Sequence, residues 1–226
     1  PGYGRNEVLR DFPLAVALHE GLPGFRYADF ASPTGGDLRF TDATGTNTIL
    51  HEIERWDPAG TSWVWVRMPE LRGAETALWA YWGHAAETNP PAYASDGAVW
   101  SPAHKLVLHM AEGTGLTAYD ATSNRVSALS SHAVSWAQPG AAGGAAAIGT
   151  RSATWKLGGG GVPMGESWTL SLWIKDTWDN SQWRGLARSQ ALHRPLMFSE
   201  NSDEFSVYVH NLVTVVKSGS SASFLP

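Results

Sequence analysis

The chain has 226 residues and no cysteine, which excludes disulfide bridges and cysteine-ligated zinc sites. Its formal net charge of -5 and the absence of any run of lysine or arginine exclude the electrostatic footprint of a nucleic-acid-binding protein. Hydrophobic residues make up 43% and charged residues 16% of the chain, which also holds 24 glycines and 13 prolines; this balance is typical of short strands joined by tight turns.

Period-two patterns predict β-strands in the first third of the chain. The first strand is expected over residues 12–18, where larger apolar side chains alternate with small ones. Residues 36–69 then hold three alternating runs, separated by Asp, Gly and Pro residues that favour turns. We therefore expect a β-meander, which Pro69 ends because proline cannot donate to a ladder. A further strand with bulky side chains on both faces is expected over residues 76–83.

A domain boundary is predicted near residues 95–103, within a segment that has the Pro, Asn, Ser and Gly content of a linker. This gives an N-terminal domain of residues 1–100 and a C-terminal domain of residues 101–226. In the second domain, strands are expected at KLVLHM (105–110) and at SWTLSLWIKD (167–176), where one face is apolar. LMFS and EFSVYVHNLVTVV predict two or three more strands, so strand-like sequence continues close to residue 226 and leaves a longer second domain open.

Two resemblances rest on the order of these motifs. Residues 11–83 resemble a bacterial envelope family of unassigned function through DFPLAVAL, GDLRFTD, HEIERWD, WVWVRMP and ALWAYWG, although His84 stands where that family usually has asparagine. Residues 105–226 resemble a laminin-G-like, concanavalin A-type lectin module through KLVLHMAEGTG, YDATSN and WTLSLWIK. The resemblances imply an all-β protein with two tandem antiparallel β-sandwich domains, jelly-roll-like in form. They also imply an exported bacterial protein, of a kind often encoded near motor subunits of the ExbB/TolQ/MotA type.

Glu52 and Glu54 are candidate catalytic residues. Two positions apart on a strand, they share one face, with α-carbons roughly 6.5 Å apart. Retaining glycosidases need two carboxyl groups about 5 to 5.5 Å apart, so the spacing permits that chemistry. The alternative is that both carboxylates face solvent or pair with Arg39, Arg55 or Arg67.

The twelve tryptophans suggest stacking against sugars, because an aromatic face suits the apolar face of a sugar ring. Core packing is the preferred interpretation for those on alternating strand positions, which are Trp56, Trp63, Trp65, Trp79 and Trp82. The candidate ligand-binding residues are Trp173, opposite the apolar face of its predicted strand, and Trp178 and Trp183 in a polar loop.

Asp120, Thr122 and Asn124 are candidate calcium ligands, because YDATSN offers hard oxygen atoms at alternating positions. The laminin-G-like resemblance adds weight, since some such modules bind calcium at an Asp-rich turn. Asp176 and Asp179 could join from a neighbouring loop. The alternative is an Asx turn without a metal.

These patterns favour binding over catalysis. We expect a non-catalytic module that recognises glycans or a cell-surface protein, within a larger bacterial chain or assembly in the periplasm, on the outer surface or outside the cell, without inserting into a membrane. Two alternatives stay open, a structural module that docks another protein of an envelope assembly associated with ExbB/TolQ-type motors, and a glycoside hydrolase that uses Glu52 and Glu54.

Overall fold

The structure, a computed structural model, describes residues 7–73, 76–149, 154–163, 167–175, 184–188, 195–200 and 204–207. Antiparallel strands dominate these residues, which contain no α-helix, so the all-β prediction is confirmed at this level. They also contain no helix long and apolar enough to cross a lipid bilayer. The chain divides into two compact units, Pro1–Trp168 and Thr169–Pro226, while the domain boundary expected near residue 100 stays a prediction.

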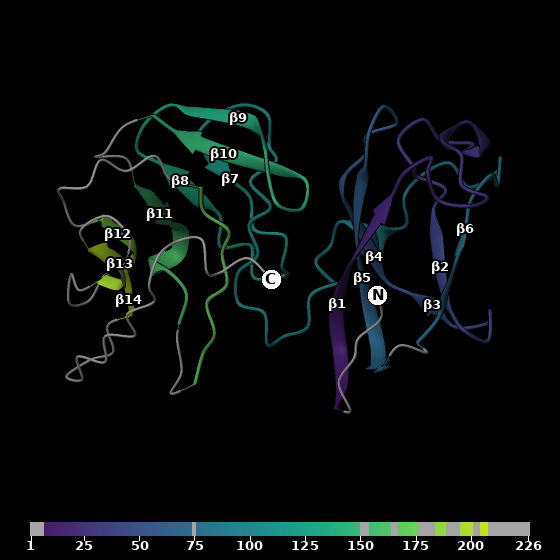
Figure 1. Ribbon diagram of the computed structural model, residues 1–226, viewed down its shortest axis with the longest axis horizontal. Helices are drawn as coiled ribbons and strands as arrows, with labels where there is room; N and C mark the ends of the chain where they lie inside the picture. The colour runs from purple at the N-terminus through teal and green to yellow at the C-terminus, as the bar shows by residue number, and fades with distance from the viewer. Residues whose placement is uncertain are drawn as a thin grey trace. The chain divides into compact units, whose positions relative to one another are not determined.

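Two three-stranded antiparallel sheets make up the first part of unit 1 (Figure 1). One sheet has the order β1-β5-β4, and the other has the order β3-β2-β6. The first contains β1 (Val8–Leu18), β5 (Ser62–Arg72) and β4 (His51–Arg55), and the second contains β3 (Thr48–Ile49), β2 (Arg39–Asp42) and β6 (Leu78–Tyr81). Two short 3-10 helices, η1 (Tyr27–Asp29) and η3 (Ala92–Ala94), lie in connecting segments.

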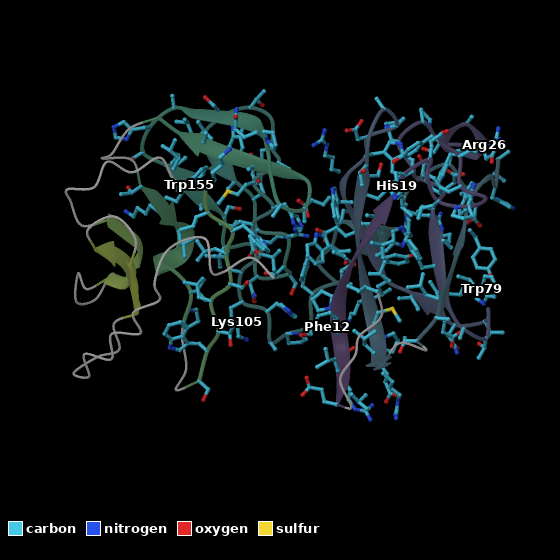
Figure 2. The ribbon with its side chains drawn as sticks, in the orientation of Figure 1. Phe12, His19, Arg26, Trp79, Lys105 and Trp155 are labelled. Atoms are coloured by element: carbon cyan, nitrogen blue, oxygen red, sulfur yellow. The ribbon has the colours of Figure 1, made fainter. Side chains whose placement is uncertain are left out.

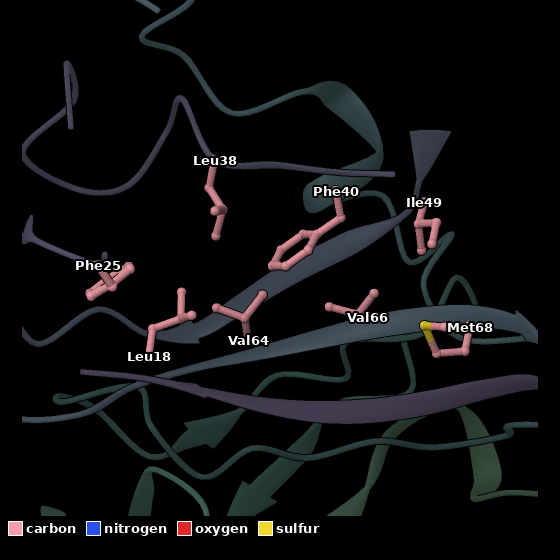
Figure 3. Packing of buried hydrophobic residues seen from close by; sticks show 8 residues of the cluster. All are labelled: Leu18, Phe25, Leu38, Phe40, Ile49, Val64, Val66 and Met68. Atoms are coloured by element: carbon pink, nitrogen blue, oxygen red, sulfur yellow. The ribbon is translucent and has the colours of Figure 1, made fainter. Parts of the chain in front are cut away.

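The main hydrophobic core draws side chains from both sheets (Figure 3). Val64 and Val66 of β5 are buried in it, while Trp63 and Trp65 alternate with them on the opposite face and are only half-buried. Its buried members are Leu18, Phe25, Leu38, Phe40, Ile49, Val64, Val66 and Met68. The alternation in β5 is therefore as predicted, whereas the pattern left open which of its two faces enters the core.

The consecutive antiparallel pairing of the predicted β-meander is confirmed, but its strands do not form one sheet. β2 pairs with β3, the start of the second predicted run, whereas β4, the rest of that run, pairs with β5 in the other sheet. The chain passes between the sheets at Leu50, which separates β3 from β4, and β6 completes the sheet of β2. Alternation determines which side chains share a face, but it does not show that one run is divided between two sheets.

Pro69 does not end its ladder, because β5 continues to Arg72. In the register, Phe12 pairs with Met68 and Arg10 pairs with Glu70, and the intervening Asp11 and Pro69 are skipped. Asp11 has a φ of 49°, a left-handed conformation that marks the irregularity opposite the proline. The strand therefore tolerates Pro69 at a position where no ladder hydrogen bond is needed.

The second part of unit 1 consists of smaller sheets around a minor core of Ala118, Ala128 and Trp136. One sheet has the order β11-β8-β7, and β9 and β10 form a two-stranded sheet. The strands are β7 (Thr117–Ala118), β8 (Ala128–Ser130), β9 (Val134–Pro139), β10 (Gly144–Ile148) and β11 (Trp155–Leu157). The 3-10 helix η4 (Gly158–Gly160) follows β11.

The strand expected over residues 105–110 is wrong. Only Leu108 forms a bridge there, with Asp120. The physical reason is that the backbone N–H of Val107 donates to the carboxylate of Asp120 at 3.0 Å instead of to a ladder carbonyl. A side-chain acceptor thus replaces the partner strand.

Unit 2 holds one described sheet, of order β12-β13-β14. Its strands are β12 (Arg184–Arg188), β13 (Pro195–Glu200) and β14 (Glu204–Val207), and the last two confirm the strands expected at LMFS and at the start of EFSVYVHNLVTVV. The strand expected over residues 167–176 is wrong, because the described residues 167–175 contain none. Leu170, Leu172 and Ile174 are exposed there, so an apolar alternation without a neighbouring strand does not form a ladder.

His51 is a buried histidine that should make the fold sensitive to acid. It is 1% exposed, and its ring lies edge-on to Phe40. Burial and the nearby charge of Arg39 lower the pKa of His51 to about 4. Because the unfolded chain binds the proton more readily than the folded one, neutral His51 contributes to the stability of the fold. This contribution is present above pH 6.5 and is lost as the pH falls through 4.

We therefore expect the free energy of unfolding to fall by about 3 kcal/mol between pH 6.5 and pH 4 through His51 alone. Urea titrations at several pH values measure this effect in the wild type and in His51→Gln. The variant should lose this part of the pH dependence. An equal slope in both proteins would show that His51 is not the group responsible.

Candidate functional site

Glu52 and Glu54 extend from the same face of β4, as their spacing predicts. His51 and Ile53 contact the core from the other face. The side chains of Glu52 and Glu54 are only 11% and 4% exposed. Two buried carboxylates on one strand need compensation, since burial of an unpaired charge is costly.

The predicted alternatives for these carboxylates are wrong, because the nearby arginines have other partners. Arg39 pairs with Glu87, Arg55 with Asp57, and Arg67 with Asp11. Nor do the two carboxylates face solvent. The compensating cation comes instead from outside the strand pair.

That cation is His109, which lies between the two carboxylates. Its Nε2 lies 2.5 Å from Oε1 of Glu52, and its Nδ1 lies 3.3 Å from Oε2 of Glu54. Because carboxylates only accept hydrogen bonds when ionised, both ring nitrogens must be donors, which makes the ring an imidazolium. We call Glu52, Glu54 and His109 the His109 clasp.

Two tryptophans complete the surroundings of the clasp. The indole Nε1 of Trp65 donates to Oε2 of Glu54 at 2.6 Å, and that of Trp100 donates to Oε2 of Glu52 at 3.1 Å. The ring of His109 lies 6.2 Å from that of Trp65 and 5.7 Å from that of Trp100, measured between centroids. Each carboxylate therefore binds one indole and one side of the imidazolium.

The electrostatics of the clasp favour the charged histidine. Burial by itself lowers the pKa of His109, but the hydrogen bonds to Glu52 and Glu54 and their charges outweigh it and raise the pKa to about 9. At neutral pH the imidazolium cancels one of the two negative charges. In this state neither ring nitrogen has a free lone pair to act as a general base, so the geometry is that of a structural link between β4 and the segment carrying His109.

A cavity of about 310 Å³ opens beside the clasp. Its lining includes Glu52, Glu54, His109, Glu112, Tyr119 and Arg125. Within the described part of the chain, Oε2 of Glu112 is buried without a hydrogen-bond partner, while its Oε1 accepts from the backbone of Tyr119 at 2.7 Å. The described residues contain no group of three or more His, Asp and Glu side chains placed to hold a metal ion.

The candidate calcium loop is an Asx turn in this structure. Asp120 is buried, and its Oδ1 accepts from the backbone N–H groups of Thr122 and Val107, each at 3.0 Å. Its Oδ2 accepts from the hydroxyl of Thr122 at 2.8 Å and from the backbone of Val126 at 2.9 Å. The amide nitrogen of Asn124 donates to the backbone carbonyl oxygens of residues 104 and 105, so this side chain also stabilises the loop. Calcium binding stays a prediction.

The tryptophans divide into packed and exposed groups. Trp56 and Trp82 pack against the main core, as expected. The same expectation is wrong for Trp63 and Trp65, which lie on the other face of β5, where Trp65 donates to Glu54. Trp79 differs, since 56% of its surface is exposed. Trp173 is 69% exposed, which agrees with its expected exposure. The other candidates in its loop, Trp178 and Trp183, and the acidic residues Asp176 and Asp179 lie outside the described residues.

Trp79 shares its face of β6 with Tyr81, which is 47% exposed. We call these two residues the β6 aromatic face; Figure 2 labels Trp79. The indole Nε1 of Trp79 donates to the carbonyl oxygen of Ala43 at 3.1 Å, which holds the ring in one orientation. Sequence reasoning did not single out Tyr81, although its position two residues after Trp79 placed it on the same face.

Comparison with known proteins identifies one region of this mostly β chain. Residues 34–101 match a family described as a domain of unknown function, DUF2341. The chain therefore contains such a domain in the region where its motifs resemble a family without an assigned function. The matched range includes β4 and β6, whereas His109 lies beyond it. No curated protein and no solved structure matches the chain, and the laminin-G-like resemblance stays a prediction.

Proposed function

We propose that the chain is a non-catalytic recognition module that binds glycans through the β6 aromatic face. The observation that carries this proposal is the exposure of two aromatic side chains, Trp79 at 56% and Tyr81 at 47%, on one face of a strand. Exposed aromatic rings side by side are unusual unless something covers them, and sugars stack on such rings. The fixed indole of Trp79 reduces the entropy lost on binding.

We also propose a more detailed architecture, with two tandem β-sandwich domains. The core shared by β1-β5-β4 and β3-β2-β6 supports a β-sandwich for the N-terminal domain. A second, laminin-G-like sandwich over residues 101–226 is supported by motif order alone. We further propose that the protein is exported and that its partner is a glycan on a cell surface or in an extracellular matrix.

Protein docking is the second candidate, and the edge position of β6 favours it. Among the described strands β6 ends the order β3-β2-β6, and an edge strand of this kind can pair with another chain. A glycoside hydrolase is the third candidate, because Glu52 and Glu54 line the cavity beside the clasp. Both carboxylates are held by His109, which is the reason we rank hydrolysis below recognition.

A glycan-array screen of the intact chain, run with calcium and again with EDTA, tests the proposal. We expect glycan binding in both conditions. The double variant Trp79→Ala/Tyr81→Ala should lose at least about tenfold in affinity, because aromatic anchors typically contribute about 2 kcal/mol or more. Leu129→Ala serves as the control, since Leu129 is 54% exposed but lies outside both the β6 aromatic face and the cavity lining. Circular-dichroism melting checks that all variants fold.

Other outcomes would assign the function elsewhere. Binding that disappears in EDTA would point to the loop of Asp120, Thr122 and Asn124. Binding that Trp173→Ala abolishes, while the double variant keeps it, would move the site to Trp173. Absence of any glycan binding would contradict the proposal and favour docking of a protein. Hydrolysis of a glycan that Glu52→Gln abolishes would establish the third candidate.

A further inference from the structure

We propose that the β6 aromatic face takes a neutral oligosaccharide of at least two sugar units, an inference that rests on the proposed glycan recognition. Trp79 and Tyr81 are two residues apart on one strand, so their α-carbons are roughly 6.5 Å apart. Side chains at successive same-face positions of a strand lie in a row along it, which suits successive units of a sugar chain. Each ring offers a platform for one unit of a chain.

The cation that borders this face already has hydrogen-bond and ion-pair partners. Arg39 lies opposite Tyr81 in the ladder and is the only cation among the four residues that pair with β6. Its guanidinium donates to the carbonyl oxygens of Gly36 at 2.8 Å, Leu38 at 2.7 Å and Asn89 at 3.2 Å, and pairs with Glu87 at 3.5 Å. The guanidinium of Arg39 therefore has no free pair of N–H groups to bind the carboxylate of an acidic sugar.

The nearest anion in the ladder does not lie on this face. Asp42 pairs with Leu78, whose side chain packs against the core, and its carboxylate accepts from the hydroxyl of Thr44 and the amide of Asn47, each at 2.6 Å. These hydrogen bonds lower the pKa of Asp42 to about 2, so its charge is satisfied within the turn. A cationic sugar therefore gains little from Asp42.

Neutral hydroxyl groups border the face instead. Thr41 pairs with Trp79 in the ladder, and the hydroxyls of Thr44 and Thr46 lie 2.6 Å apart in the turn that follows. The same turn touches both rings, because Trp79 donates to Ala43 and a side-chain carbon at Gly45 would lie 3.4 Å from the hydroxyl of Tyr81. Aromatic platforms beside hydroxyls and backbone amides suit the alternating apolar and hydroxyl surfaces of neutral sugars.

Isothermal titration calorimetry with defined sugars tests this inference. The neutral probes are glucose, cellotetraose, maltotetraose and tetra-N-acetylchitotetraose. Polygalacturonate is the anionic probe, and chitosan oligomers are the cationic probe. We expect at least one neutral tetrasaccharide to bind about tenfold or more tightly than glucose, with an affinity that changes less than about twofold between about 50 and about 500 mM salt. Trp79→Ala and Tyr81→Ala should each weaken it, whereas Leu129→Ala should not.

The contradicting outcomes separate this inference from the proposed function. Tightest binding of polygalacturonate or chitosan, with strong salt dependence and loss in Trp79→Ala, would overturn the neutral class and keep glycan recognition at this face. Equal affinity for glucose and the tetrasaccharides would overturn the two-unit length. Binding of no probe, combined with an empty glycan array, would overturn the proposed function itself.

Discussion

Replacing His109 with alanine is expected to lower the free energy of unfolding by about 3–5 kcal/mol at neutral pH, because it leaves two buried carboxylates without their cation. The side chains of Glu52 and Glu54 are 11% and 4% exposed, so water cannot fully replace the imidazolium. Urea denaturation followed by tryptophan fluorescence measures the change. His84→Ala is the matched control, since His84 is exposed and should change stability by less than about 0.5 kcal/mol.

A second variant isolates the charge effect from loss of packing. Glu52→Gln/Glu54→Gln/His109→Ala removes both negative charges, and we expect it to be more stable than His109→Ala alone. Equal stability of the two variants would show that the carboxylates do not depend on His109. A loss below about 1 kcal/mol in His109→Ala would contradict the clasp as described.

The clasp also predicts sensitivity to alkali. The folded-state pKa of His109 is raised to about 9, so its stabilisation is fully present below its usual pKa of 6.5 and is lost as the pH rises through 9. The expected loss is about 3 kcal/mol over this range. The direction is opposite to that expected for His51, so the two histidines together should give a stability maximum near neutral pH.

Asp37→Ala is expected to destabilise the fold by about 3 kcal/mol or more, because the variant leaves buried backbone N–H groups without an acceptor. Asp37 is 2% exposed and accepts from the backbone of Ala31 at 2.9 Å, Ser32 at 3.0 Å and Gly83 at 2.7 Å. It thereby ties the end of β6 to the loop before β2. Thermal and urea unfolding measure the loss, with the exposed Asp29→Ala as control.

Lowering the pH should also remove the contribution of Asp37 to the stability of the fold. Burial by itself raises the pKa of Asp37, but the hydrogen bonds from Ala31, Gly83 and Ser32 outweigh it and hold the pKa below the usual 3.8. The stabilisation is therefore present above pH 3.8 and is lost as the pH falls below it. A wild-type stability that matches Asp37→Ala at neutral pH would contradict this role.

The sequence predicted local features of the fold well and long-range ones poorly. Alternation along residues 62–68 identified which side chains of β5 share a face, because that property depends only on strand geometry, but it did not show which face enters the core. Asp37 is buried although it directly precedes the buried Leu38 in the sequence. Its burial depends on Ala31 and Gly83, which loops bring to it from both sides of the chain.

In the candidate site, too, local features were predictable from the sequence and long-range ones were not. The two-residue spacing placed Glu52 and Glu54 together, but the group that compensates them comes from more than fifty residues further along the chain. No periodicity marks His109 as their partner, and a lone histidine on an apolar pattern carries no such information. Likewise, alternation placed Trp79 and Trp82 on opposite faces of their predicted strand, but it did not show which face the core covers.

The measurement that tests the central claim most directly is a nuclear magnetic resonance titration of the indole N–H signals with the best ligand from the glycan array. Trp79→Ala identifies the signal of Trp79 by its disappearance. Glycan recognition through the β6 aromatic face predicts that this signal shifts in a saturable way, while those of Trp65 and Trp100 beside the clasp stay in place. A ligand that binds while the signal of Trp79 does not move would contradict the account.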